Sequence, residues 1–178
     1  PSTIRKSKAF LENQFLLKNI TDFNIRIGAE HMIDDKFQKL LSQNEIVPLN
    51  QDHLLIEMSF MQAAINFSES VQQIKEEGYF PILAHPERYN FLQNNSRQHN
   101  EYRNQGIYYQ LNLLSLSPYY GGSVQKKAIS LLEKGMYDYI GSDVHNLNQI
   151  VVLKEIKISK KIIGLISNLV EKTNYSFK

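Results

Sequence analysis

Short apolar runs alternate with amphipathic segments along this chain, a pattern typical of strands alternating with helices. Three such runs repeat most regularly: Phe80–Ala84, Ile107–Leu113 and Tyr137–Ser142. Each follows a helix-like segment that ends at a glycine, and Gly78, Gly106 and Gly135 lie 28 and 29 residues apart. That spacing matches one helix-plus-strand unit. The pattern therefore predicts consecutive β/α units of one parallel sheet or barrel.

Two further strands and several helices complete the predicted order. The strands are expected at Phe23–Glu30 and His53–Phe60. Helices are expected over residues 1–19, from Asp34 or Asp35 through Leu41, over Met61–Glu77 and in part of Gln93–Asn104. A further helix is expected to end near Lys134. One or two helices are expected after Asn146, with Lys154–Lys161 in a packed, solvated helix. Five strands alternating with helices favour the α/β class with a parallel sheet. Because a complete (β/α) barrel takes about 250 residues, five strands indicate an incomplete barrel.

Side chains with metal-binding chemistry follow four of the five predicted strands. They are Glu30, Glu57, His85, Asp143 and His145. Because the carboxyl ends of parallel strands lie at one edge of the sheet, we expect these side chains to converge. Carboxylates and imidazoles bind divalent ions such as Mn, Fe or Zn. Carboxylates also bridge ions readily, so the pattern favours a site with more than one ion.

Each of these residues also has a plain structural interpretation. Glu57 lies in an apolar strand, where a carboxylate is costly unless it pairs with an arginine or binds a metal. Pro86 is expected to hold His85 in an extended conformation and so to fix the direction of the imidazole. Arg88 has the planar geometry to contact a phosphate through two N–H groups. The alternative for this segment is a surface turn with a salt bridge between Glu87 and Arg88.

The other candidates carry weaker signals. Asp143 and His145 are two residues apart, so their side chains point the same way, but a capped loop with an incidental histidine is an equal interpretation. Glu30 is also typical of a plain acid ahead of a helix. The remaining histidines are interpreted as a loop residue, a strand start and a solvated surface residue, in the order His31, His53 and His99.

Composition and charge narrow the functional classes. With 178 residues, the chain fits one domain over residues 1–178. Its 20 basic and 18 acidic residues give a net charge of +2, too small a basic field to argue for nucleic acid. The absence of cysteine excludes a disulfide framework and a cysteine nucleophile, and fits the reducing cytoplasm, where we expect the protein.

No apolar stretch reaches the roughly 20 residues that cross a bilayer. Because the chain opens on Pro1, we expect its natural N-terminus to be missing.

Four short motifs together resemble a known superfamily. They are Leu55-Ile56-Glu57, Ala84-His85-Pro86-Glu87-Arg88-Tyr89, Gln110-Leu111-Asn112 and Gly141-Ser142-Asp143-Val144-His145-Asn146. The chain is similar over nearly its whole length to the polymerase-and-histidinol-phosphatase (PHP) superfamily. Within that superfamily it resembles the bacterial manganese-dependent protein-tyrosine phosphatases of capsular and exopolysaccharide operons. The resemblance implies a distorted TIM-like barrel of about seven β/α units.

The resemblance also implies roles for individual residues. It makes Glu30, Glu57, His85, Asp143 and His145 ligands of a multinuclear metal site, with manganese first and iron or zinc as alternatives. It makes Arg88 the residue that holds the substrate phosphate. The implied reaction is attack of a metal-bound hydroxide on phosphotyrosine. The implied substrate is the tail of a bacterial tyrosine kinase that controls polysaccharide export, with no role for nucleic acid or membrane insertion. Family members form rings or dimers, so a homo-oligomer stays open.

The chain departs from the family pattern in two places. The family opens with an Asp-x-His-x-His strand and then a Thr-Pro-His strand, and neither motif is present here. We therefore expect a barrel that lacks its N-terminal strands. The family also carries a second arginine soon after Asp-x-His, where this chain offers only Lys154. Two alternatives stay open: a PHP phosphoesterase acting on a small molecule such as histidinol phosphate, and a non-catalytic regulatory module.

Overall fold

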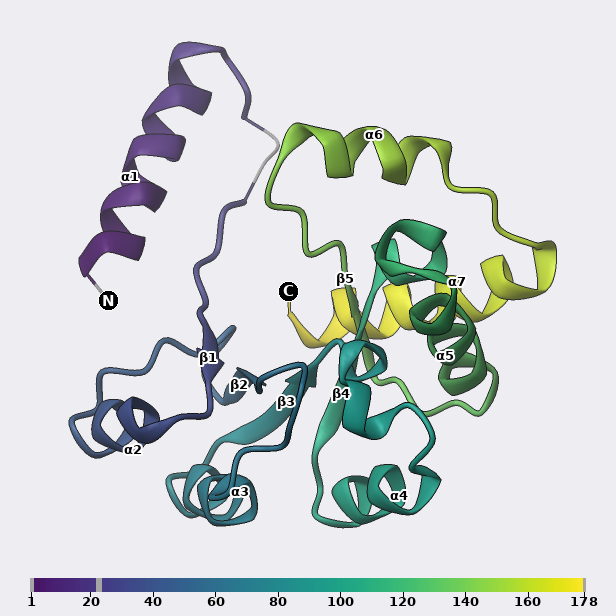
Figure 1. The fold of residues 1–178 in the computed structure, drawn as a ribbon. Coiled ribbons are helices and arrows are strands. Elements are labelled where there is room, and N and C mark those ends of the chain that lie inside the picture. Colours follow the sequence, from purple (N-terminus) through teal and green to yellow (C-terminus); the bar gives the residue numbers. More distant parts are fainter. Residues whose placement is uncertain (1, 22–23, 178) are drawn as a thin grey trace.

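The structure, a computed structural model, describes residues 2–21 and 24–177 and contains one five-stranded parallel sheet (Figure 1). The strands are β1 (Glu30–Met32), β2 (His53–Glu57), β3 (Phe80–Ala84), β4 (Tyr108–Asn112) and β5 (Tyr139–Gly141). They lie side by side in chain order, and every neighbouring pair is parallel. The prediction of an α/β fold with a parallel sheet is therefore confirmed. All five carboxyl ends consequently lie along one edge.

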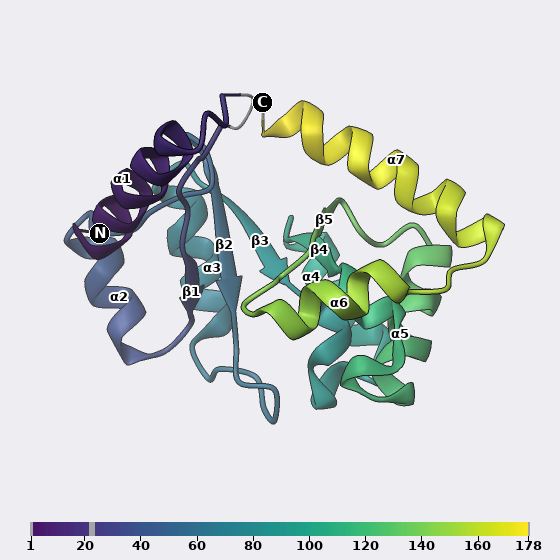
Figure 2. The ribbon, with the colours of Figure 1, turned by 90° about the horizontal axis from the view of Figure 1, so that it is seen from above.

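Helices connect the strands and flank the sheet. They are α1 (Ser2–Leu17), α2 (Asp35–Ser42), α3 (Phe67–Glu76), α4 (Ser96–Asn104), α5 (Gly122–Glu133), α6 (Leu147–Glu155) and α7 (Lys160–Ser176). Four 3-10 turns, η1 (Pro86–Arg88), η2 (Asn90–Leu92), η3 (Leu113–Leu116) and η4 (Pro118–Tyr120), follow β3 and β4. Seen from above, α1 and α2 lie on the β1 side, whereas α5, α6 and α7 lie on the β5 side (Figure 2). Within the described residues, no helix combines the length and apolar character needed to cross a bilayer.

Period-two alternation in the strands divides the core into two apolar clusters. On the face that packs against the helices, Leu54, Ile56 and Leu83 are fully buried together with Phe37 of α2 and Ile74 of α3. The opposite face carries a smaller cluster, formed by Leu55, Ile82, Ala84 and Tyr139. The same alternation decides on which face of the sheet the last residue of a strand lies. Glu57 follows Leu55 on the face of the smaller cluster, two residues further along β2.

The glycines that end the predicted helices have the expected role. Gly78, Gly106 and Gly135 follow α3, α4 and α5 with φ angles of +85°, +78° and +65°. A residue with a side chain is strained in this left-handed conformation, whereas glycine adopts it readily. The repeating glycine pattern therefore marks real helix ends, and each is followed within four residues by the next strand.

Two strand predictions need correction. The strand expected at Phe23–Glu30 begins only at Glu30, and Phe23 lies outside the described residues. Before Glu30 the chain pairs with the segment ahead of β2, since the Ala29 N–H donates to Val47 O at 2.9 Å. Gly28 lies so close to Leu49 that an added Cβ would meet its Cδ2 at 2.6 Å. The strand expected at His53–Phe60 ends at Glu57, because the chain then leaves the sheet.

Two helix predictions also need correction. The helix expected at Met61–Glu77 begins only at Phe67. The chain ahead of this loop is tied to the η2 turn, since the Asn90 N–H donates to Phe60 O at 2.8 Å. The helix expected through Lys154–Lys161 is interrupted: α6 ends at Glu155, and Ser159 caps a new helix through its side chain.

His99 was expected at the solvated surface but is buried, with 1% of its surface exposed. Its Nε2 lies 3.2 Å from Leu92 O, which can only accept, so Nε2 carries the proton. Its Nδ1 accepts from the Tyr109 hydroxyl at 3.1 Å. Sequence reasoning missed this role because the neighbours along α4 are polar, while the histidine itself faces the sheet.

The burial of His99 predicts a pH dependence of stability. Burial, with the nearby Lys127 charge, lowers the pKa of His99 to about 4 from its ordinary value of 6.5. Between these values the unfolded chain binds a proton that the folded chain does not, so stability falls as pH falls. We expect His99 to reduce the free energy of unfolding by about 2 kcal/mol between pH 7 and pH 5. Urea titrations at both pH values measure this difference.

The control for this prediction is His99→Gln, which keeps a polar side chain but does not titrate. The loss between pH 7 and pH 5 should shrink by about 2 kcal/mol in the variant, even if the variant is less stable at both pH values. An unchanged loss would show that another group titrates.

Candidate metal centre

Three of the predicted ligands converge near the carboxyl ends of β2 and β3. Glu30 begins β1, Glu57 ends β2 and His85 directly follows β3. Each offers a ligand atom, and these atoms all lie within 4.8 Å of one another. His85 Nε2 lies 2.9 Å from Glu30 Oε1 and 3.8 Å from Glu57 Oε2. Neighbouring parallel strands thus bring together residues that lie far apart in the sequence.

The electrostatics of this cluster fit a bound cation. Glu30 Oε1 is buried and accepts no hydrogen bond, although His85 Nε2 lies 2.9 Å from it. His85 Nδ1 is also buried without a partner. Burial, followed by the nearby Glu30 charge, raises the pKa of Glu57. Unpaired buried polar atoms and adjacent carboxylates are costly, and a divalent ion would relieve both costs. Two carboxylate oxygens and one imidazole nitrogen form a donor set suited to such an ion.

The backbone conformation of His85 differs from the expected one. Its φ and ψ angles of 36° and 55° are left-handed, so the extended conformation expected before Pro86 is wrong. The hydrogen bonds explain the difference. The His85 N–H donates to Gln110 O in β4, and His85 O accepts from the Arg88 N–H, both at 2.9 Å. The chain must therefore leave the sheet and enter the η1 turn within one residue, which is a strained arrangement for a residue other than glycine.

Asp143 and His145 form a second group close to the first. The two side chains meet, with Asp143 Oδ1 lying 2.9 Å from His145 Nε2, although both residues lie in the loop after β5 and not in the strand. Asp143 is largely buried and also has a left-handed backbone, with a φ of 50°. The His145 side chain is 71% exposed. The three-residue cluster does not include this pair.

Arg88 connects to this second group. Its Nη1 donates to Asp143 Oδ2 at 3.1 Å, and the same oxygen accepts from Asn112 Nδ2 at 2.7 Å. The guanidinium carbon lies 4.4 Å from the centre of the Phe60 ring and 4.2 Å from that of Tyr120. The arginine is therefore held by one ion pair and two aromatic contacts.

The alternative of a surface turn with a Glu87–Arg88 salt bridge is wrong. Glu87 is fully buried, and burial raises its pKa. Its Oε2 accepts from the Tyr137 hydroxyl at 2.9 Å, and its Oε1 accepts from the Asn112 N–H at 3.1 Å. Glu87 points into the core, whereas Arg88, the next residue, contacts Asp143.

Sequence reasoning missed four residues around the centre: Phe60, Glu87, Asn112 and Tyr120. Asn112 was quoted as part of a motif without a role, although an amide at the end of a strand is a usable signal. No period or motif separates Phe60 from ordinary apolar residues, and core packing was the favoured interpretation of the Tyr119-Tyr120 pair, whose alternative was to line a pocket for an aryl ring. The two histidines interpreted structurally lie away from the cluster. His31 Nε2 accepts from the Val47 N–H, and His53 lies among the rings of Phe80, Tyr108, Tyr139 and Phe177.

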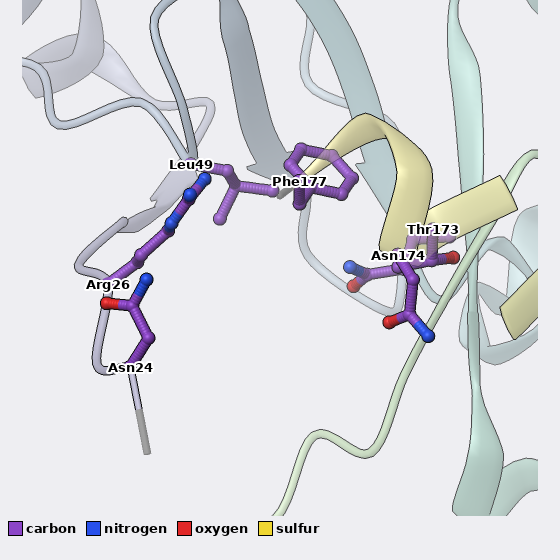
Figure 3. Close-up of a pocket in the computed structure, with 7 residues that line it drawn as sticks. Asn24, Arg26, Leu49, Thr173, Asn174 and Phe177 are labelled. Atoms are coloured by element: carbon purple, nitrogen blue, oxygen red, sulfur yellow. The ribbon is translucent and has the colours of Figure 1, made fainter. Parts of the chain in front are cut away.

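A pocket of about 610 Å³ lies apart from these residues (Figure 3). Asn24 and Arg26 line one side, and Thr173, Asn174 and Phe177 line the other, near the end of α7. Leu49 and Phe177 point toward each other between the two sides. None of the six candidate site residues lines this pocket, so we do not assign it to the metal centre.

Comparison with known proteins gives concordant matches. Residues 2–155 match the family described as "Capsular polysaccharide synthesis, CpsB/CapC". Tyrosine-protein phosphatase CpsB of Streptococcus pneumoniae is 32% identical over 147 residues, which cover 78% of this chain and 60% of that protein. Tyrosine-protein phosphatase YwqE of Bacillus subtilis is 24% identical over 148 residues, which cover 83% of this chain and 58% of that protein. The chain thus spans about 60% of the length of these relatives.

A solved structure shares the fold. It comes from crystal structures of YwqE from Bacillus subtilis and CpsB from Streptococcus pneumoniae, described as unique metal-dependent tyrosine phosphatases. The match has a TM-score of 0.76 and 22% sequence identity, and covers 97% of this chain and 74% of the other. With the sequence match over residues 2–155, these findings show that the chain belongs to the CpsB/CapC family of capsular polysaccharide synthesis.

Proposed function

We propose that this chain carries the metal centre of a metal-dependent protein-tyrosine phosphatase that acts in capsular polysaccharide synthesis. The observation that carries the proposal is the convergence of Glu30, Glu57 and His85, with Glu30 Oε1 and His85 Nδ1 buried and without a hydrogen-bond partner. The names of the relatives supply the reaction: CpsB and YwqE are tyrosine-protein phosphatases.

In this proposal Glu30, Glu57, His85, Asp143 and His145 hold the metal ions. We propose manganese as the metal, with iron and zinc as the competitors, and more than one ion in the complete centre. Bound ions would supply an activated water as nucleophile and would neutralise charge on the phosphate. The division into a three-residue cluster and an Asp143–His145 pair supports at least two ion positions.

Arg88 is proposed to bind the phosphate of the substrate. Its side chain reaches Asp143, so its guanidinium lies beside the candidate ligands. Only one of its side-chain N–H groups has a hydrogen-bond acceptor within the described part of the chain. The others remain available to a phosphate oxygen, and a guanidinium matches phosphate geometry well.

The wider setting of the proposal follows the family resemblance. We propose a distorted PHP barrel of about seven β/α units, of which the five-stranded sheet forms part, in a single domain over residues 1–178. The proposed substrate is a phosphotyrosine tail of a bacterial tyrosine kinase in the cytoplasm. The proposal includes neither nucleic acid nor insertion into a membrane. A ring or dimer of the chain is compatible with it.

Turnover of a phosphotyrosine peptide with added Mn²⁺ tests the proposed function. We expect Glu57→Gln to lower kcat/KM at least a hundredfold, because the neutral amide is a poor ligand for a hard cation. Glu77→Gln makes the same chemical change at an exposed position after α3 and should leave turnover unchanged. Release of inorganic phosphate measures both rates.

The same assay separates the competing functions. Hydrolysis of histidinol phosphate at a higher kcat/KM than that of the peptide would replace the protein substrate with a small molecule. No hydrolysis of either substrate by folded protein with bound metal would contradict both phosphatase roles. A folded chain that binds no metal would favour the non-catalytic module.

Metal content provides a second, independent test. Replacing both Asp143 and His145 with alanine should reduce the number of Mn²⁺ ions per chain without abolishing binding, because the Glu30–Glu57–His85 cluster is preserved. Glu57→Gln should weaken binding at the three-residue cluster. Elemental analysis after equilibrium dialysis measures the ratio. Equal metal content in the wild type and the double variant would remove Asp143 and His145 from the ligand set.

A further inference from the structure

Two aromatic rings from separate loops contact the guanidinium of Arg88 at the same time. The Phe60 ring centre lies 4.4 Å from the guanidinium carbon and the Tyr120 ring centre 4.2 Å. Both distances are well inside the about 6 Å range of an attractive cation–π contact. Phe60 comes from the loop after β2, and Tyr120 from the η4 turn after β4. The rings therefore approach the arginine from two different connections of the sheet.

Each ring is itself held by residues of the metal centre or its surroundings. Phe60 packs against the rings of His85 and Tyr89 at 5.5 and 5.8 Å. The Tyr120 hydroxyl lies 3.4 Å from Asn112 Nδ2, which also donates to Asp143 at 2.7 Å. The positions of the rings are thus coupled to the residues around the centre.

Ordinary core packing does not account for these contacts. Phe60 keeps 38% of its surface exposed, and Tyr120 is only half-buried. The Arg88 side chain, by contrast, is only 19% exposed. A free arginine side chain has many rotamers, so fixing its plane before a ligand binds removes much of the entropic cost of binding.

We propose that Phe60 and Tyr120 are positioning residues that hold the Arg88 guanidinium in the orientation that binds the substrate phosphate. The inference rests on the proposed phosphatase function, because it assigns the two rings to the same site. Asp143 accepts a hydrogen bond from one N–H group of the Arg88 guanidinium, and the two aromatic rings pack against the guanidinium. The remaining N–H groups donate to no acceptor among the described residues and are held in a fixed plane, where they can meet an oxyanion.

The first test is independent of turnover. The rings should shift the NMR signal of the Arg88 side-chain Nε–H through their ring currents, in protein without metal. Phe60→Leu and Tyr120→Leu should each move this signal toward the value of a free arginine. An unmoved signal in both variants would overturn the inference, whether or not the protein is a phosphatase.

The second test measures binding of inorganic phosphate to the Mn²⁺-loaded protein by calorimetry. Phe60→Leu and Tyr120→Leu should each weaken binding about tenfold, consistent with the loss of one desolvated cation–π contact. Adding either change to Arg88→Ala should cause no further loss, because the rings act only through the arginine. Additive losses in the double variants would show that the rings act on their own and would overturn the inference.

Two matched controls separate positioning from packing. Phe91→Leu removes a ring that packs against Tyr89 at 5.5 Å, as Phe60 does, but for which no contact with Arg88 is found. Tyr119→Leu removes the ring next to Tyr120, at 4.9 Å, likewise without such a contact. Both controls should leave the Arg88 signal and phosphate affinity unchanged. Equal effects in the controls would reduce the proposed role to general packing.

The two proposals fail in different ways. If wild-type protein binds phosphate and shows the coupling, but does not hydrolyse a phosphotyrosine peptide, the positioning role stands and the proposed reaction fails. If the wild type hydrolyses the peptide and Phe60→Leu and Tyr120→Leu behave as their controls do, the reaction stands and the positioning role fails.

Discussion

The geometry of the candidate centre depends on one carboxylate that is buried without a cation. Glu87 accepts hydrogen bonds from the Tyr137 hydroxyl and the Asn112 backbone, and so ties the η1 turn to β4 and to the chain entering β5. His85 and Arg88 lie in the same short segment, on either side of this anchor. A fully buried acid with satisfied oxygens is difficult to displace. The turn that carries a candidate ligand and the candidate phosphate-binding residue is therefore a rigid part of the core.

Around this anchor the charges remain unbalanced. Glu30 and Glu57 lie against His85, and Arg88, the arginine near them, is already paired with Asp143. The folded chain thus holds acidic groups together that would repel one another without a cation. The cluster around Asp138 is an example of a buried carboxylate whose charge is balanced by neighbouring cations. Asp138 is buried, but Arg103, Lys172 and the Tyr109 N–H surround it and hold its pKa low despite burial. The contrast favours a metal at the first cluster and a purely structural role at the second.

The sequence predicts the order of elements well because it depends on local signals. Helix ends at glycine and apolar strand runs are both encoded within a few residues, as at Gly78 and Phe80–Ala84. It also predicts the meeting of Glu57 and His85, because a parallel sheet brings strand ends to one edge, whereas Glu30 was expected at a strand end and instead begins β1. The resemblance to a known family added the roles but did not supply the geometry.

What the sequence does not predict depends on contacts between distant segments. The backbone at Ala29 pairs with Val47, ahead of β2, rather than extending the ladder, and Gly28 packs closely on Leu49. His99 and Glu87 look like surface residues among polar neighbours, and only the packed sheet shows that they are buried. Phe60 and Tyr120 meet at Arg88 from loops that lie sixty residues apart in the chain. No period or motif along the sequence carries that information.

The left-handed backbone conformations of His85 and Asp143 lower the stability of the folded chain at two residues of the candidate centre. Each such residue costs about 1–3 kcal/mol relative to a relaxed conformation, and glycine would remove most of that cost. Selection for stability alone would thus favour glycine at these two positions of the candidate centre. That histidine and aspartate occupy them, in spite of the strain, is what a site retained for its chemistry would look like.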